Sequence, residues 1–515
     1  MVPWHRLLLY PAGWYVRDVP VAATLALPRG LRAFTALAVA RRGGGPAADT
    51  VAFAPATLEA LADAPVYAGR YWRQFDLTPG VLGAAADVAG DSEGRATGYT
   101  VGRVRLDVLA DAPADLAVPP DEVTRLRALV AQTVRVFGPA PYRHYDALVS
   151  LSDALSPGRG VEHLEEGENN VPAQYFADLP HQLNNRDLIA HELVHAWNGR
   201  ARQPADLWSP TFNLPVRGSL LWVYEGQTEF WGRVLAARAG LRTRQETLDK
   251  LALDAALVAT RPGRAWKSLA DGTNDALYMA GHPVAWRDWQ RRENYYPEGV
   301  LLWLDVEARL RERTRGARGL DDVARRFFAT RGTSNSRDSA PAATTTYTFR
   351  DVCAALDAVA PDDWAAFLRR HLDTHVDTEA TAGLARAGWR LVYDTTASET
   401  FRQDEAEAGV RNLDYSIGLQ VRANGGVRSV VWGGPAFAAG LAPGARITAV
   451  AGRPFSGAAV EAAVRTSAGA PLALTVEAGG RTRVLAIPYR GTLRYPRLER
   501  IPDAPDRLSP LLAAR

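Results

Sequence analysis

The stretch HELVHAWN, residues 191–198, carries two histidines four positions apart and a glutamate directly after the first. Positions i and i+4 of an α-helix lie on one face, so His191 and His195 can turn ring nitrogens toward one small ion. Glu192 is offset by one position, where a carboxylate can act as general base on an attacking water. The alternative is a helix that carries two imidazoles by chance. Because the neighbouring residues are too apolar for a surface helix, the spacing favours a metal site.

A catalytic zinc site needs a third protein ligand and an open fourth position. The next candidate is Glu225 in LLWVYEGQTEFWG, residues 220–232, an acid within an apolar run. A buried carboxylate is costly unless it is paired or bound to metal. We therefore expect His191, His195 and Glu225 to hold one Zn²⁺ per chain; the alternative for Glu225 is an acid that faces solvent. Glu229, one turn further, either orients a ligand histidine or is solvated or salt-bridged.

Two buried helices must position these side chains. For the first, Asn184 and Asn185 are expected to cap the start and Gly199 the end. For the second, Ser219 precedes the helix and Gly240 closes it. TRQE (243–246) and TFRD (348–351) are typical of capping boxes at the start of two further helices.

The composition limits the class of protein. At 515 residues the chain is expected to hold about three domains. A net charge of +3, with acids and bases interspersed, argues against nucleic acid and membrane-surface partners. The single cysteine, Cys353, excludes an internal disulfide and a cysteine-based metal site. No apolar run approaches about 18 residues and the N-terminus lacks a signal-peptide core. The chain as given is therefore expected in the cytoplasm, or in the periplasm if its N-terminus is truncated.

The residue pattern changes twice along the chain. Residues 1–120 contain short β-type runs split by glycine and proline, which predicts a β-sandwich-like domain. An amphipathic helix over 119–138, a strand over 145–152 and a mainly helical region follow. After about residue 390 the chain is β-rich again. The fold class is thus multidomain α+β.

The segment from 415 to 489 contains short strands around one helix, GAAVEAAVRT. A strand entered through Ile417-Gly418-Leu419 is similar to the carboxylate-binding loop of a PDZ domain, in which backbone amides hold a peptide C-terminus. We expect a PDZ domain over 391–490 that either binds a protein C-terminus or gates the active site, and a tail over 491–515.

With these pieces in order, the chain resembles the glycyl aminopeptidase family of gluzincin metallopeptidases. HELVHAWN is similar to the zinc motif of that family, LLWVYEGQTEFW to its third-ligand helix, and residues 295–328 to the helix pair that follows. The resemblance implies an N-terminal β-domain, a thermolysin-like catalytic domain over 121–390 and a C-terminal PDZ domain.

The resemblance also implies roles for single residues. It assigns the same three zinc ligands and makes Glu192 the base. Tyr296 matches the tyrosine that hydrogen-bonds the oxyanion, and Glu162 matches the acid that holds the substrate's free α-amino group. Arg159, Val161 and Glu298 depart from the family pattern, which puts the substrate subsite in doubt.

The expected function is zinc-dependent removal of small N-terminal residues, Gly or Ala, from peptides with a free N-terminus. One alternative is an endopeptidase on the same scaffold, if Glu162 does not meet the amine. The other is an inactive PDZ adaptor, which the presence of all four metal-site residues argues against.

Overall fold

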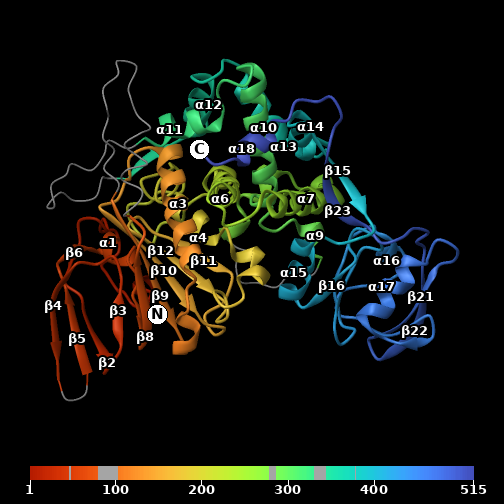
Figure 1. Ribbon diagram of the computed structural model, residues 1–515, viewed down its shortest axis with the longest axis horizontal. Helices are drawn as coiled ribbons and strands as arrows, with labels where there is room; N and C mark the ends of the chain where they lie inside the picture. The colour runs from red at the N-terminus through yellow and green to blue at the C-terminus, as the bar shows by residue number, and fades with distance from the viewer. Residues whose placement is uncertain (46–47, 79–101, 278–285, 330–343, 377) are drawn as a thin grey trace.

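The computed structural model describes residues 1–515 except 46–47, 79–101, 278–285, 330–343 and 377. It is a multidomain α+β structure (Figure 1). Small antiparallel sheets lie at the N-terminal and C-terminal ends of the molecule, and helices fill the middle. Among the described helices, none is both long enough and apolar enough to cross a membrane.

The N-terminal part is built from short antiparallel strands, as the β-type runs predict. A three-stranded sheet in the order β2-β5-β4 is accompanied by the pairs β1-β6 and β3-β7. Alternating apolar side chains of these strands pack around Trp4 and Val66. The elements are β1 (Pro20–Val21), β2 (Thr24–Pro28), β3 (Arg32–Phe34), β4 (Val39–Gly44), β5 (Ala48–Phe53), β6 (Ala56–Thr57), α1 (Leu58–Ala62) and β7 (Tyr67–Gly69).

A five-stranded sheet in the order β11-β12-β10-β9-β8 supports the site. β10 pairs in parallel with β9 and β12, while β8 and β11 form antiparallel edges. β10 is buried along almost its whole length, as a central parallel strand requires. β8 and β9 lie within the range expected for the N-terminal domain, yet they pair into this sheet. The elements are β8 (Tyr71–Asp76), β9 (Arg103–Ala110), α3 (Pro120–Phe137), β10 (His144–Leu151), β11 (Arg159–Glu162) and β12 (Glu166–Val171).

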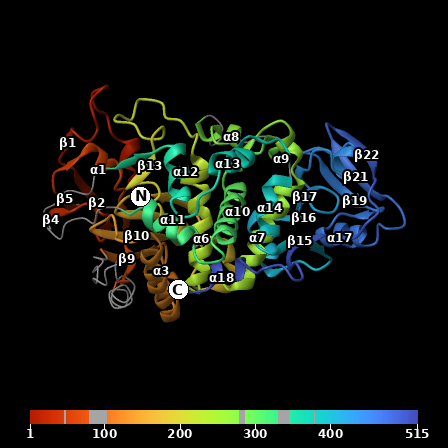
Figure 2. The ribbon, with the colours of Figure 1, turned by 90° about the horizontal axis from the view of Figure 1, so that it is seen from above.

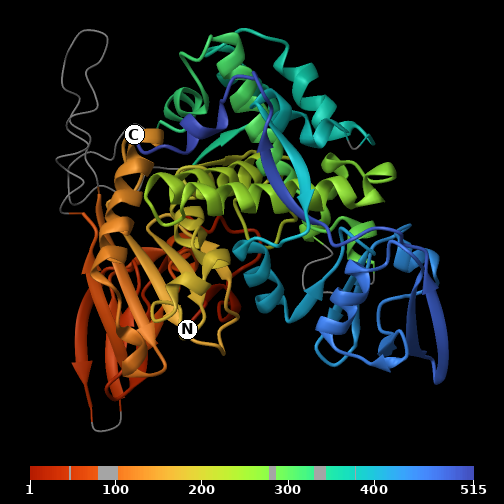
Figure 3. The ribbon, with the colours of Figure 1, turned by 45° about the vertical axis from the view of Figure 1, so that its right-hand side comes forward.

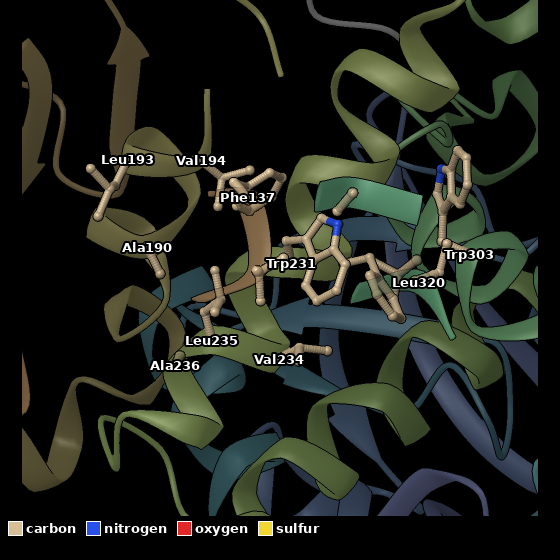
Figure 4. Close-up of a cluster of buried hydrophobic side chains, with 14 of the residues drawn as sticks. Phe137, Ala190, Leu193, Val194, Trp231, Val234, Leu235, Ala236, Trp303 and Leu320 are labelled. Carbon is tan, nitrogen blue, oxygen red and sulfur yellow. The ribbon is translucent and has the colours of Figure 1, made fainter. Parts of the chain in front are cut away.

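Two helices behind the sheet carry the metal-site residues. α4 (Leu188–Val194) packs against α6 (Gly226–Arg238) and against β11 and β12. Figure 4 shows Ala190 of α4 beside Leu235 and Ala236 of α6. Phe137 at the end of α3 lies between these helices and contacts the ring of Trp231, with centroids 5.7 Å apart. This core fixes the two helices relative to each other.

Near the site, Gly240 closes the second helix as expected, with a φ of 75°, but the expected start of the first helix and the continuity of the second are wrong. α4 starts at Leu188 with Asp187 as its N-cap, and Asn184 and Asn185 belong to a preceding 3-10 turn instead of capping it. The second helix is divided into α5 (Leu221–Tyr224) and α6, with Glu225 at the junction. Both predicted capping boxes are confirmed, at the starts of α7 and α12.

The remaining helices form a layer around α6 and α10. Figure 2 shows this layer in the middle of the molecule, between the N-terminal and the C-terminal strands. The pair expected over 295–328 is confirmed as α10 and α11. The elements are β13 (Arg202–Pro204), α7 (Arg244–Thr260), α8 (Leu269–Gly272), α9 (Arg287–Gln290), α10 (Pro297–Arg313), α11 (Leu320–Phe327), β14 (Thr345–Tyr347), α12 (Phe349–Asp357), α13 (Trp364–Asp373) and α14 (Thr378–Arg386).

The C-terminal part contains two small sheets, β16-β17-β18 and β20-β19-β21-β22, packed with α17 around a second apolar core. The last strand, β23, leaves this part and pairs with β15, and α18 then packs on α6 (Figure 3). Residues 491–515, expected as a tail, are thus folded against the helical layer. The elements are β15 (Trp389–Asp394), α15 (Glu399–Ala408), β16 (Val410–Asn412), β17 (Leu419–Arg422), β18 (Val427–Val430), α16 (Pro435–Ala438), β19 (Arg446–Val450), β20 (Arg453–Pro454), α17 (Gly457–Arg465), β21 (Leu472–Ala478), β22 (Arg481–Ile487), β23 (Tyr495–Arg500) and α18 (Leu508–Leu512).

Candidate metal centre and active site

Three side chains expected to hold metal, those of His191, His195 and Glu225, converge on one point, which is called the metal point below. His191 Nε2 and His195 Nε2 are 3.1 Å apart. Glu225 Oε2 lies 3.5 Å from the first nitrogen and 3.4 Å from the second. The histidines come from successive turns of α4, and Glu225 from the junction of α5 and α6, so the packing of these helices brings the three together.

Hydrogen bonds to the other ring nitrogens set the orientation of both imidazoles. His191 Nδ1 lies 2.8 Å from Glu229 Oε2, and His195 Nδ1 lies 2.9 Å from the carbonyl oxygen of Asn198. Both partners are acceptors, so each Nδ1 carries the hydrogen and donates it. In the neutral rings, each Nε2 then presents a lone pair. Glu229 therefore orients a candidate ligand, which was one of the two roles expected for it.

The arrangement fits a divalent cation. Two lone pairs at 3.1 Å repel each other unless a cation lies between them. With zinc–ligand bonds of about 2.0–2.1 Å, a tetrahedral site has ligand atoms about 3.3 Å apart, close to the three distances above. Glu225 Oε2 is buried and has no hydrogen-bond partner among the described residues. Burial lowers the pKa of His191, but the neighbouring carboxylates of Glu225 and Glu229 raise that pKa well above 6.5. The pocket thus favours positive charge.

Glu192 lies beside this point and over β11. Its side chain is buried, and a Cβ added to Gly160 would fall 1.9 Å from Glu192 Oε1. Glycine at position 160 therefore makes the room that the carboxylate occupies. Burial raises the pKa of Glu192 to about 7, although His191 and His195 oppose the shift. A carboxyl group with such a pKa can both take and return a proton near neutral pH.

Glu162, at the end of β11, lies next to this centre. Ligand atoms of Glu162, Glu192 and His195 lie within 4.8 Å of one another. The Tyr224 hydroxyl donates a hydrogen bond to Glu162 Oε1. The Tyr224 ring also lies against His195, with centroids 4.9 Å apart. Tyr224 thus orients the acid.

Tyr296 lies at the N-terminus of α10, with its ring 6.1 Å from that of His191. A pair of glycines permits this approach, because a Cβ on Gly299 would fall 2.5 Å from the Cα of Gly226. Burial and the charge of Glu225 raise the pKa of Tyr296 well above 10, so its hydroxyl keeps its proton. The group next to the metal point is therefore a hydrogen-bond donor.

Glu298, one of the departures from the family pattern, does not face the metal point. It is 3% exposed and ion-paired with Arg264 and Arg291, and Asn294 Nδ2 donates to it over 2.9 Å. The residue therefore anchors the start of α10. His163 lies between Asp63 and Glu168, where its role is structural.

Some contributing residues carried no signal that could be recognised in the sequence. Tyr224 and Gly160 act through contacts between distant segments, so residue spacing does not reveal them. Asn198 is different, because it stands within HELVHAWN itself. Its side chain donates to the carbonyl of Val223 over 2.9 Å and so ties the end of α4 to α5.

A family model and solved structures of other proteins match this chain. Residues 184–302 match the model of the M61 glycyl aminopeptidase family. A crystal structure of an aminopeptidase N family protein from Idiomarina loihiensis is similar to this chain, with a TM-score of 0.69 and 18% identity. The alignment covers 96% of this chain and 80% of that protein's chain. That likeness shows the fold.

A mutant M1 zinc metallopeptidase from Deinococcus radiodurans bound to a Tyr-Ser-Ala substrate has a TM-score of 0.41 and 14% identity, and it covers 68% of this chain and 63% of its own. A likeness this weak carries no argument. No curated protein matches the sequence. The matched segment contains the three candidate ligands, and the match supports a peptidase, that is, a hydrolase. The resemblance to the glycyl aminopeptidase family is thereby confirmed.

Proposed function

We propose that this protein is a zinc aminopeptidase that removes small N-terminal residues, Gly or Ala, from peptides. His191, His195 and Glu225 hold the metal. The observation that carries the proposal is the carboxylate of Glu162, oriented by Tyr224 and within 4.8 Å of Glu192 and His195 ligand atoms. An acid beside the reacting centre pairs with an ammonium group one residue from the scissile bond and excludes longer N-terminal extensions. The preference for small residues rests on the family resemblance.

The residues of the chain divide the work of amide hydrolysis. Zinc, when bound, lowers the pKa of a water and polarises the substrate carbonyl. Glu192 takes a proton from the attacking water and returns it to the leaving amine, which its pKa of about 7 favours. The Tyr296 hydroxyl donates a hydrogen bond to the oxyanion, a contact of about 3 kcal/mol in such sites. Glu162 fixes the register by holding the α-ammonium group.

We also propose the division into an N-terminal β-domain, a thermolysin-like catalytic domain and a PDZ-like C-terminal domain. Support for the last comes from the strand order and from α17, which packs on the apolar core of the two small sheets. Peptides with a free N-terminus are the proposed partners of the catalytic site.

The test uses two peptides that begin Gly-Ala and differ only in N-terminal acetylation. We expect chelator-sensitive release of single residues from the free peptide and none from the acetylated one. Glu192→Gln should lower kcat by at least about 100-fold with metal still bound. Glu162→Gln should lower kcat/KM by about 100-fold for the free peptide.

Internal cuts in both peptides would instead identify an endopeptidase. If neither peptide is cut while zinc is confirmed bound by elemental analysis, the proposed activity on such peptides is wrong.

A further inference from the structure

The segment that leads into Tyr296 has an unusual backbone. Three non-glycine residues adopt a positive φ in the short run before α10: Trp286 at 60°, Arg291 at 50° and Glu293 at 58°. Each such residue costs about 1–2 kcal/mol relative to the right-handed region. A run with three of them persists only where surrounding contacts hold it.

One set of contacts comes from within the helical layer. Both oxygens of the buried Glu298 are ion-paired, one with Arg264 and the other with Arg291. Lys267 Nζ donates to the carbonyl of Gln290 over 2.9 Å. Trp266 Nε1 also donates to the carbonyl of Trp289 over 3.0 Å, so contacts from the helical layer hold the run from Trp289 onward, and Trp286 and Asp288 lie before them.

A second set of contacts comes from the C-terminal part of the chain. The backbone N–H of Trp432, between β18 and α16, donates to Asp288 Oδ2 over 2.6 Å. The Trp432 ring stacks on Trp289, with centroids 4.9 Å apart and planes at 25°. Trp286 meets Trp432 edge-on, with centroids 5.2 Å apart. α9 lies beside this C-terminal part in Figure 1.

We call the contacts of Trp432 with Trp286, Asp288 and Trp289 the clamp. Asp288 is 4% exposed, so its carboxylate is largely removed from water and depends on the donor that Trp432 supplies. Stacked aromatic rings add about 0.5–1.5 kcal/mol beyond their buried area. The contacts fall on Trp286, Asp288 and Trp289, seven to ten residues before Tyr296, and not on the helices that carry the candidate metal ligands.

We propose that Trp432 is a positioning residue for Tyr296: the C-terminal part holds α9, and through it the strained run, so that the tyrosine hydroxyl faces the metal point. The inference rests on the proposed function for its kinetic consequence. It predicts that loosening the clamp removes the contribution of Tyr296 and leaves metal and substrate binding in place.

The first test is a double-mutant cycle in the full chain with zinc bound. Trp432→Ala should lower kcat by about 10-fold or more with KM within about two-fold. In a Tyr296→Phe background the same change should have almost no further effect, because the group it positions is gone. Trp432→Phe, which keeps a ring for stacking, should recover most of the activity. Trp14→Ala, an exposed tryptophan of the N-terminal segment, is the matched control.

Equal losses of kcat in both backgrounds, or loss of zinc from the Trp432→Ala protein, would overturn the inference. Should that variant fail to fold, Asp288→Ala removes the other half of the clamp, with Asp288→Asn as its conservative counterpart.

A second readout does not need activity. Hydrogen exchange followed by mass spectrometry should show faster exchange over residues 286–297 in Trp432→Ala, with the α4 segment unchanged. If the wild-type protein cleaves no peptide, the proposed function fails while this measurement still decides the inference. Unchanged exchange over residues 286–297 would reject it.

Discussion

At the scale of residues, the site depends on partners that hold the reactive groups rather than on those groups alone. Glu229 and the Asn198 carbonyl fix the tautomers of both histidines, and Tyr224 fixes Glu162. Residues in this role commonly change metal affinity or activity by about 10–100-fold when they are replaced. A glycine can have the same kind of role, because the space that it leaves can hold a reactive side chain.

Gly160→Ala should separate the base from the metal. The added methyl group would fall 1.9 Å from Glu192 Oε1, so the carboxylate must move or β11 must shift. Because the three atoms nearest to the added Cβ all belong to Glu192, we expect kcat to fall about 10–100-fold while zinc content stays the same. Steady-state kinetics and elemental analysis on the same preparation would measure both quantities.

A matched control is Gly272→Ala in α8, where nothing lies within 4 Å of the added Cβ. This variant should keep full activity. Gly160→Ala with wild-type kcat would mean that Glu192 does not need its observed position.

The candidate ligands were predictable because their geometry is local. The i, i+4 spacing of His191 and His195 is a property of any helix, and an acid in an apolar run, such as Glu225, has few inexpensive roles. Tyr224 was not predictable as the partner of Glu162, because the two residues are 62 positions apart and meet only when β11 packs near α5. Pairings of this kind need the tertiary structure.

At the scale of elements, helix existence was predictable, and helix ends were predictable only where a capping box or a closing glycine marks them. The apolar periodicity correctly indicated helices around both metal-site segments, but α4 begins at Leu188 and α5 gives way to α6 at Glu225. Tertiary contacts set these ends. Next to the junction, Gly226 packs so closely on α10 that a Cβ there would fall 2.9 Å from the Cα of Gly299.

The C-terminal sheet shows a similar effect of tertiary context on the expected peptide site. β17 pairs with β18 on one side and with β16 on the other, so both edges are used. The carbonyl of Leu413 accepts hydrogen bonds from the amides of Ser416, Ile417 and Gly418, each over 3.1 Å. The amides of Ile417 and Gly418 belong to the loop expected to bind a peptide carboxylate.

We therefore expect peptides with free C-termini to bind the wild-type protein only with a Kd above about 100 µM. Displacing β16 would break several hydrogen bonds and expose the buried Leu413 side chain, at a cost of several kcal/mol. A cost of about 4 kcal/mol reduces an apparent affinity by about 1,000-fold. Fluorescence polarisation with labelled peptides ending in Leu, Val or Ala measures this Kd, with C-terminally amidated peptides as controls. Tight binding of the free-acid peptides alone would contradict this prediction and show that a peptide can displace β16 from β17.

At the scale of the whole molecule, buried charges join the N-terminal part to the sheet that supports the site. His163, which follows β11, lies between Asp63 after α1 and Glu168 of β12, at 3.1 and 3.2 Å. Asp63 is also paired with Arg200 at 2.5 Å, and the Tyr67 hydroxyl donates to Glu168. This network follows Glu162 directly in the chain, so the joint between the two parts also supports the end of the site that we propose to bind the substrate amine.

The His163 bridge predicts a stability that falls in alkaline solution. Burial alone would lower the pKa of His163, but the carboxylates of Asp63 and Glu168 raise it to about 10. Because the folded pKa exceeds the unfolded value of about 6.5, the stabilisation is complete below that value and is lost as the pH rises through 10. His163→Gln should therefore lower the free energy of unfolding by about 3 kcal/mol at pH 6–7, and the difference should shrink steadily by pH 10.5. Thermal and urea unfolding of both proteins across this range measures the difference, with His181→Gln, an exposed histidine, as the control. A difference that stays constant with pH would mean that His163 is neutral in the folded protein and that packing alone accounts for its effect.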